Sequence, residues 1–499
     1  MRTHIDLPIS LSRGSDLPLT AQLAGWLRGA MLDGTLAPGE RLPSSRALAA
    51  QLAVSRTVVT EAYQQLYAEG WLDGRHGSGT FVADMERPRP PSERPYVPAP
   101  EPPPADVIDL TPGEPWVRDY DRAAWKRAWR RAGDLPPGAS PDPYGLPRLR
   151  ELLADHLRRA RGMAVGPENI LVTRGTGNGL DLCALALLGA GARAGVEDPG
   201  YHVARTVFAA RGAEVVPCPV DEDGVIVDRL PAGLSLLYTT PAHQYPLGGR
   251  LPIPRRERLL SWARSTGATI VEDDYDAEFR YDVAPLPALY GLDPSRVVLL
   301  GTLSKILAPD VGVGWLVGEP ELVARIAGLR RAVADRTSGP VQQAVAALLE
   351  RGDLDRHLRR MRLEYARRRA VVVEVLGPVC RLRGDTAGLH VLAELPSAVA
   401  AVVVERARER GVLVDSMARH HHGPARLPGV VIGYGSASLA DVRRGCRVLA
   451  ELIRDAVTEG AARPPAHAVR EGPARRTAGR PAGRAVPTIG RAPGQGTPR

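Results

Sequence analysis

A proline-rich stretch at residues 86–106 limits how this chain can fold more than any other feature. Prolines repeat there with few apolar residues, as in Pro88-Arg89-Pro90-Pro91 and Pro100-Glu101-Pro102-Pro103-Pro104. Proline restricts its own φ and donates no backbone hydrogen bond, so such a stretch favours an extended, semi-rigid linker. We therefore expect two folded units, at residues 1–85 and 107–458, instead of one continuous core.

The distribution of charge limits what can be concluded from the net charge of +9. Residues 463–499 hold eight arginines and a single acid, Glu471, whereas residues 1–85 hold seven arginines and eight acids. Total charge is therefore no argument that the first unit binds nucleic acid. From residue 459 onward Pro, Gly, Ala and Arg dominate without apolar periodicity, which predicts a disordered tail at 459–499.

Several classes of protein and site are disfavoured by what the sequence lacks. It has no run of about twenty apolar residues and no signal-peptide pattern, so we expect a cytoplasmic protein that does not contact membranes. The run His420-His421-His422 is interpreted as an exposed loop, because consecutive residues rarely converge on one ion. No metal site is predicted. The cysteines are far apart in sequence and are expected to remain reduced thiols: Cys183, Cys218, Cys380 and Cys446.

The first unit has the pattern of three helices followed by a hairpin. Leucine and methionine recur at helical spacing between residues 19 and 31, a second helix is predicted from Ser44, and a third from near Ser55. Two strand-like runs follow at residues 71–73 and 80–82, on either side of a glycine-rich turn. This order predicts a winged helix-turn-helix.

The start of the third helix carries the physical case for DNA binding. Ser55-Arg56-Thr57 offers hydroxyls, a guanidinium and backbone amides to base edges and phosphates. Arg46 and Arg75 are placed to contact the flanking backbone. A three-helix module for protein interaction has the same pattern, so periodicity alone leaves both interpretations open.

Four segments of this unit are similar to the GntR-family DNA-binding domain. The resemblance implies a DNA surface made of Arg46, Ser55, Arg56, Thr57, Arg75 and Gly77. The segments are Pro38-Gly39-Glu40-Arg41-Leu42-Pro43-Ser44-Ser45-Arg46, Val54-Ser55-Arg56-Thr57-Val58-Val59, Ala62-Tyr63-Gln64-Gln65-Leu66 and Gly77-Ser78-Gly79-Thr80-Phe81-Val82.

The second unit alternates apolar runs with helical segments, which predicts a mixed α/β domain with a mainly parallel sheet. The run 170–173 leads into Gly175-Thr176-Gly177-Asn178-Gly179, a strand-to-helix turn whose free amides can hold a phosphate. The run 268–271 ends in Glu272-Asp273-Asp274-Tyr275-Asp276. These acids suit a solvated strand end, a Mg²⁺ site, or a carboxylate that keeps a pyridine nitrogen protonated.

Lysine is almost absent, and one of the two copies follows the apolar run 297–300. That residue, Lys305, can form a Schiff base with an aldehyde cofactor, whereas an arginine cannot. Lys126 lies in an amphipathic stretch and is interpreted as an ordinary surface residue. The position of Lys305 therefore predicts an imine with an aldehyde cofactor.

Taken in order, six segments of the second unit resemble fold-type I aminotransferases, and the whole chain resembles the MocR-type regulators of the GntR family. The segments are Asp142-Pro143-Tyr144-Gly145, Gly175-Thr176, Asp198-Pro199-Gly200-Tyr201, Pro241-Ala242-His243-Gln244-Tyr245-Pro246, Asp273-Asp274-Tyr275 and Gly301-Thr302-Leu303-Ser304-Lys305. The resemblance implies pyridoxal 5'-phosphate on Lys305, and a homodimer in which each DNA-binding domain lies over the partner's large domain.

The resemblance also implies a role for each matching residue. Asp273 would contact the pyridine nitrogen, and Tyr275 would lie near the ring oxygen. Tyr201 would stack on the ring, and His243 or Gln244 would approach its hydroxyl side. The remaining matches would line the phosphate pocket: Gly175, Thr176, Thr302 and Ser304.

Two departures from the aminotransferase pattern bear on function. Gly312 stands where the family usually has a phosphate-binding arginine, and Val430-Val431-Ile432-Gly433-Tyr434 lacks the arginine that holds a substrate carboxylate. We therefore expect a transcriptional regulator that binds pyridoxal 5'-phosphate, an amine-bearing effector, or both, and thereby controls operator binding. An active aminotransferase with a DNA-binding module remains open, as does a regulator whose pocket no longer binds the cofactor.

Overall fold

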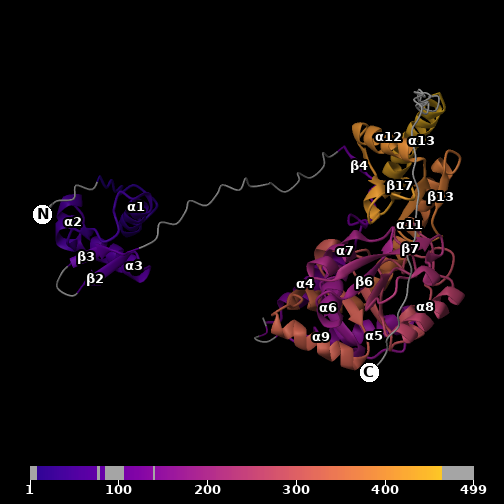
Figure 1. The fold of residues 1–499 in the computed structure, drawn as a ribbon, viewed down its shortest axis with the longest axis horizontal. Coiled ribbons are helices and arrows are strands. Elements are labelled where there is room, and N and C mark those ends of the chain that lie inside the picture. Colours follow the sequence, from indigo (N-terminus) through magenta and orange to yellow (C-terminus); the bar gives the residue numbers. More distant parts are fainter. Residues whose placement is uncertain (1–7, 76–78, 85–105, 137, 139–140, 463–499) are drawn as a thin grey trace, which may run out of the picture. The chain divides into compact units, whose positions relative to one another are not determined.

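The structure is a computed structural model that describes residues 8–75, 79–84, 106–136, 138 and 141–462. The chain divides into two compact units, Met1–Pro102 and Pro103–Arg499, and each is drawn in Figure 1. The predicted linker lies almost entirely outside the described residues. The first residues of the predicted tail continue the last helix, which ends at Ala462, and the rest of the tail lies outside the described residues.

The first unit contains three helices and a small antiparallel sheet, as expected. The sheet order is β1-β3-β2, and β1 is a short strand that the sequence analysis did not predict. The elements are α1 (Leu19–Asp33), β1 (Arg41–Leu42), α2 (Ser45–Leu52), α3 (Arg56–Ala68), β2 (Leu72–Arg75) and β3 (Gly79–Val82).

Local sequence explains where helices α2 and α3 begin. Ser44 Oγ accepts a hydrogen bond from Ala47 N at 3.2 Å, and Ser55 Oγ accepts one from Val58 N at 3.4 Å. Each serine thus satisfies an amide that the first helical turn leaves without a partner. The apolar face of α3, with Val59 and Leu66 fully buried, packs on α1. Arg46, Arg56 and Thr57, in the first turns after these caps, are exposed.

The second unit is built on an eight-stranded sheet of order β5-β12-β11-β10-β9-β6-β7-β8. Neighbours from β11 to β7 pair in parallel, whereas β12 is antiparallel to both β11 and β5, so β5 runs in the same direction as β11. The strands are β5 (Ile170–Thr173), β6 (Arg193–Asp198), β7 (Glu214–Asp221), β8 (Gly224–Val225), β9 (Leu236–Thr239), β10 (Thr269–Asp274), β11 (Val297–Thr302) and β12 (Gly314–Val317).

Both faces of this sheet are buried, which explains why its strands are continuous apolar runs. Val172 and Leu299 belong to one hydrophobic cluster, while their neighbours Leu171 and Leu300 belong to a second. Because side chains alternate along a strand, the two clusters lie on opposite faces of the sheet. The polar residues at the strand ends are therefore the ones left to form a site.

Ten helices complete the second unit within its described residues. Helix α5 packs in the cluster of Val172 and Leu299, whereas α6 and α9 pack in the cluster on the opposite face of the sheet; Figure 1 labels all three helices. The helices are α4 (Arg122–Gly133), α5 (Pro147–Arg161), α6 (Thr176–Leu187), α7 (His202–Ala210), α8 (Ile253–Thr266), α9 (Pro320–Ala332), α10 (Gly339–Glu350), α11 (Asp353–Leu376), α12 (Ser397–Glu409) and α13 (Leu439–Ala462), the first of which follows a short strand, β4 (Ile108–Asp109).

A second sheet follows toward the C-terminus, in the order β13-β14-β17-β16, and β15 pairs with β4. Among the described residues, no helix combines the length and apolar character needed to cross a membrane. The strands are β13 (Arg381–Arg383), β14 (His390–Glu394), β15 (Val412–Leu413), β16 (Asp415–Ser416) and β17 (Gly429–Gly433). Single 3₁₀ turns lie at Pro167–Asn169, Val227–Arg229, Leu289–Gly291, Pro309–Val311 and Met417–His420.

The expectation of an exposed histidine loop is wrong for two of its three residues. His420 and His421 are buried, and only His422 is exposed. The turn Met417–His420 directs them inward, where His420 Nε2 lies 3.1 Å from Asp415 Oδ2 and His421 Nδ1 lies 3.1 Å from Met417 O. Hydrogen-bond partners within the fold thus compensate for burying two imidazoles.

Candidate functional site

Five strands of the large sheet, β5, β6, β9, β10 and β11, run in one direction and end at one edge. There they border a cavity of about 380 Å³. Side chains from neighbouring parallel strands meet at such an edge, which is where ligands bind in open α/β sheets. Eight of the residues predicted for the cofactor line this cavity: Gly175, Thr176, Tyr201, Asp273, Tyr275, Thr302, Ser304 and Lys305.

One end of the cavity has the features of an anion cradle. Gly175 precedes α6 with φ +101° and ψ −179°, a conformation open mainly to glycine. A Cβ added to it would lie 3.5 Å from Thr302 Oγ1 and 3.7 Å from Ser304 Oγ. Thr302 Oγ1 in turn accepts a hydrogen bond from Ser304 N at 3.1 Å. Helix-terminal amides and two hydroxyls thus converge on space that a side chain would fill, an arrangement suited to phosphate.

A buried carboxyl group lies at the end of β10. Asp273 Oδ2 accepts a hydrogen bond from Tyr238 Oη at 2.8 Å, and its Oδ1 lies 3.4 Å from Thr176 Oγ1. Burial raises the pKa of Asp273 to about 7, against the opposing effect of the Tyr238 hydrogen bond. A protonated pyridine nitrogen beside Asp273 would supply a cation that favours the ionised form of this carboxyl group.

The amine of Lys305 lies just beyond the end of β11. Its Nζ donates a hydrogen bond to Gly113 O. Burial lowers the pKa of Lys305, while the nearby carboxylates of Glu114, Asp276 and Asp273 oppose the shift. A lowered pKa increases the fraction of neutral amine, which is the form that attacks a carbonyl carbon.

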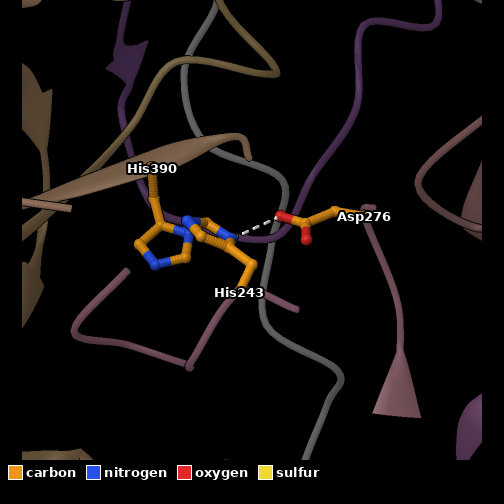
Figure 2. A group of neighbouring side chains, drawn as sticks. All are labelled: His243, Asp276 and His390. Atoms are coloured by element: carbon orange, nitrogen blue, oxygen red, sulfur yellow. Dashed lines mark hydrogen bonds and ion pairs between the residues drawn. The ribbon is translucent and has the colours of Figure 1, made fainter. Parts of the chain in front are cut away.

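A polar cluster lies behind Tyr275. Tyr275 Oη donates to His243 O at 3.0 Å and lies 3.0 Å from His243 Nδ1, which is 2.9 Å from Asp276 Oδ2. Figure 2 shows His243 directed at Asp276, with His390 beside it. Ligand-type atoms of these three residues lie within 4.8 Å of one another, a grouping that the sequence analysis did not predict. The hydrogen bond between His243 and Asp276 holds that pair together without an ion.

In the first unit, the residues of α2 and α3 that were predicted to contact DNA are exposed. Arg46, Ser55, Arg56 and Thr57 lie at the N-terminal ends of these helices, and Arg56 Nε is 3.3 Å from Ser45 Oγ. Arg75 ends β2, its side chain is not described, and Gly77 lies outside the described residues. The helix starts therefore form one polar surface that is free to meet a ligand.

Comparison with known proteins agrees with this division of the chain. Residues 19–82 match the family described as bacterial regulatory proteins, gntR family, and residues 105–427 match aminotransferase class I and II. The chain is 40% identical over 462 residues to the HTH-type pyridoxine biosynthesis transcriptional regulator PdxR of Corynebacterium glutamicum, covering 91% of this chain and 99% of that protein. It is 33% identical over 475 residues to the probable rhizopine catabolism regulatory protein MocR of Rhizobium meliloti, covering 88% and 94%.

The chain belongs to the MocR-type regulators of the GntR family. It is a transcriptional regulator with a DNA-binding unit and an aminotransferase-like domain. The large unit of this MocR-type regulator is also similar to a solved structure of LysN, an α-aminoadipate aminotransferase from Thermus thermophilus complexed with N-(5'-phosphopyridoxyl)-L-leucine. The TM-score is 0.64 at 25% identity, covering 71% of this chain and 94% of that one. The class I and II aminotransferase fold family depends on pyridoxal 5'-phosphate.

Two residues predicted for the ring hydroxyl do not line the cavity of this MocR-type regulator. Gln244 is fully buried, and its Nε2 donates to Glu197 Oε2 at 3.2 Å and Pro199 O at 3.0 Å. His243 lies behind Tyr275 instead of beside the cavity. The neighbouring Tyr245 lines the cavity in their place. Three consecutive polar residues point in different directions in a turn, and their order in the sequence did not indicate which one would face inward.

Sequence reasoning also missed several cavity residues of the MocR-type regulator. Tyr238 lies one residue before the end of β9, so the logic of strand ends could have found it. His390 comes from β14 and Arg419 from the turn between β16 and β17, both far along the chain, and no local pattern marked them. Arg174 directly precedes the predicted Gly175 and was overlooked beside the glycines.

Proposed function

We propose that this regulator binds pyridoxal 5'-phosphate, or an amine-bearing effector, in the cavity and that occupancy changes its affinity for operator DNA. The observation that carries the proposal is a single cavity bordered by an amine, a buried carboxyl group and a hydroxyl cradle. These groups belong to the same chain as a winged helix-turn-helix. The combination suits a sensor whose output is DNA binding.

The residues present fit the cofactor. When bound, pyridoxal 5'-phosphate supplies an aldehyde that condenses with a primary amine, releasing one water, and a ring that withdraws electrons. The free space in front of Gly175 would receive its phosphate between Thr302 and Ser304. Asp273 would balance the charge of a protonated ring nitrogen, and Tyr238 would keep that carboxylate in place. Lys305 would contribute the amine.

Regulation requires that the ligand bind two conformations of the protein with different affinities. We infer that the conformations differ in how helices α2 and α3 are presented to the two halves of an operator. A homodimer would supply two such surfaces, as expected for winged helix-turn-helix proteins that bind paired half-sites. The cytoplasm, where the chromosome lies, is the compartment in which such a regulator would act.

The test uses the full-length protein and a DNA duplex that it selects from a random library. Fluorescence anisotropy measures the Kd for this duplex with and without saturating pyridoxal 5'-phosphate. We expect the cofactor to change the Kd by at least about fivefold, the lower end of typical coupling, in wild type and in Lys126→Ala, but not in Lys305→Ala. Lys126 is the matched control because it is an exposed lysine of α4.

Either of two results would refute the proposal. One is an unchanged DNA affinity when the wild type is saturated with cofactor. The other is a response of Lys305→Ala equal to that of the wild type, which would exclude a role for the amine.

Transamination is the second candidate function, and Arg419 is the observation that favours it. Strand β17 contributes no arginine, but the Arg419 guanidinium lines the cavity, with Nη1 3.2 Å from Asp415 Oδ1. A guanidinium there can bind a substrate carboxylate. Steady-state turnover of amino acids with 2-oxoacids tests this candidate, and turnover that Arg419→Ala abolishes would support it.

A further inference from the structure

Arg174 lies beside the anion cradle, but the proposed function gives this residue no role. It follows the last residue of β5 and precedes Gly175, and its backbone N donates to Asn178 Oδ1 at 3.0 Å. Its side chain lines the cavity and is 54% exposed. The guanidinium is thus tethered within one residue of the amides and hydroxyls that form the cradle.

The other segment that forms the cradle, around Thr302 and Ser304, is not followed by an arginine at position 312. Gly312, where the family resemblance leads one to expect an arginine, has no side chain, and a Cβ there would meet only Asp310 O at 4.0 Å. Among the described residues lining the cavity, the other cations are Lys305 and Arg419. The Nζ of Lys305 is directed at Gly113 O, and Arg419 comes from the turn between β16 and β17. Arg174 is therefore the cation that belongs to the cradle.

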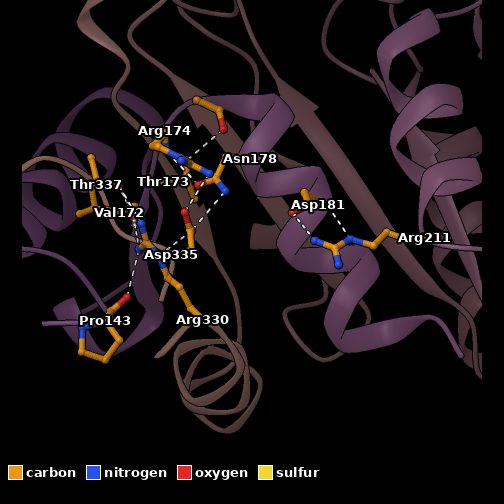
Figure 3. A network of polar contacts seen from close by, with 11 residues as sticks. Pro143, Val172, Thr173, Arg174, Asn178, Asp181, Arg211, Arg330, Asp335 and Thr337 are labelled. Atoms are coloured by element: carbon orange, nitrogen blue, oxygen red, sulfur yellow. Dashed lines mark hydrogen bonds and ion pairs between the residues drawn. The ribbon is translucent and has the colours of Figure 1, made fainter. Parts of the chain in front are cut away.

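Asp335, which pairs with Arg174, has a second cationic partner. Arg174 Nη2 lies 2.8 Å from Asp335 Oδ1, but Asp335 Oδ2 also accepts from Arg330 Nε at 3.0 Å. Arg330 is fully buried and is further fixed by Val172 O and Thr337 Oγ1. Figure 3 shows Asp335 between the two arginines. If Arg174 moved away, Arg330 would still neutralise Asp335.

Releasing Arg174 from Asp335 therefore costs little. Ion pairs made by half-exposed arginines are weak, because water screens them and the long side chain loses entropy. A phosphate monoester in the cradle carries more negative charge than one carboxylate that is already neutralised, and a planar guanidinium can bind it with two parallel hydrogen bonds.

We propose that Arg174 turns from Asp335 to the phosphate monoester of the bound ligand and supplies the guanidinium that position 312 lacks. This inference rests on the proposed function, because it assigns the phosphate contact of the same cavity. It identifies the ligand class as a phosphorylated aldehyde or amine, in preference to the unphosphorylated form.

The experiment compares pyridoxal 5'-phosphate with pyridoxal, which has the same ring and aldehyde but no phosphate. Isothermal titration calorimetry on the full-length protein gives Kd values for both in wild type, Arg174→Ala and Arg211→Ala. Arg211 is the matched control, since it pairs with Asp181 on α6 at 2.6 Å, is similarly exposed, and does not line the cavity. Figure 3 shows this pair next to the Asp335 network.

We expect Arg174→Ala to weaken binding of pyridoxal 5'-phosphate by about tenfold or more, as for loss of a hydrogen bond to a charged group. Pyridoxal binding should change by less than about twofold, and Arg211→Ala should alter neither Kd. Equal losses for both ligands in Arg174→Ala, or no loss for either, would overturn the assignment.

A wild type that binds neither compound would refute the proposed function, and inorganic phosphate then decides the role of Arg174. Phosphate binding to wild type that disappears in Arg174→Ala would support an anion site at this residue. Phosphate binding that is absent from both proteins, or equal in both, would overturn it.

Discussion

Gly175 offers the sharpest test of the cradle, because a single methyl group probes both backbone strain and ligand space. Alanine at φ +101° and ψ −179° would be strained by about 1 to 3 kcal/mol. The added methyl would face Thr302 Oγ1 at 3.5 Å and Ser304 Oγ at 3.7 Å. If it displaces one hydrogen bond to a charged phosphate, binding loses about 1.5 to 3 kcal/mol. We therefore expect the Kd for pyridoxal 5'-phosphate to rise by about 10- to 150-fold.

Gly162→Ala is the control for Gly175→Ala, because it introduces backbone strain without filling space that the ligand needs. Gly162 ends α5 at φ +63°, and a Cβ there would meet nothing within 4 Å. We expect it to cost about 1 kcal/mol of unfolding free energy and to leave the Kd unchanged. Calorimetric titration gives the Kd, and urea unfolding followed by tryptophan fluorescence gives the stability. Wild-type affinity in Gly175→Ala, or an equal loss of affinity in Gly162→Ala, would refute the reasoning.

Three further predictions address DNA binding, protonation and folding. Arg56→Ala should weaken DNA binding and reduce the slope of log K against log salt by about 1, whereas Arg28→Ala, whose guanidinium pairs with Glu69 at 2.8 Å, should leave the slope unchanged; anisotropy at several salt concentrations measures both. In the ligand-free protein, the raised pKa of Asp273 means that its stabilising contribution is complete below the ordinary value of 3.8 and is lost as the pH rises through about 7. The unfolding free energy of wild type relative to Asp273→Asn should therefore fall by up to about 1.4 kcal/mol per pH unit in that window, and a pH-independent difference would contradict this. Arg330→Met should lower the unfolding free energy by about 3 kcal/mol, because Val172 O loses its 2.6 Å partner and the Thr337 hydroxyl a 2.8 Å one; a loss below about 1 kcal/mol would show that this buried network contributes little.

Features set by local chemistry could be predicted from the sequence. Serine is a good helix N-cap in most contexts. Helices α2 and α3 begin directly after Ser44 and Ser55. The class of the large unit followed from apolar runs that alternate with helical segments. Polar residues directly after those runs, such as Thr302 and Lys305, lie at the cavity because parallel strands end at one edge.

Features set by tertiary packing could not be predicted in this way. His420 and His421 are buried because Asp415 and the backbone of Met417 provide partners, and neither contact has a local signature. Tyr245 faces the cavity and Gln244 does not, because Gln244 is fixed by Glu197 and Pro199 from another strand end. The cavity residues that were missed come mainly from segments that meet only in the folded chain.

The contrast between the two lysines has a practical consequence for chemical labelling. Apart from the α-amino group of the chain, an amine-reactive reagent finds only Lys126, which is exposed, and Lys305, which lies inside the cavity with a pKa lowered by burial. Peptide mapping after brief labelling therefore follows Lys305 with Lys126 as an internal reference. Any molecule that fills the cavity should slow modification at this position, so a screen for the natural effector can be conducted without DNA, a reporter gene or a coloured ligand.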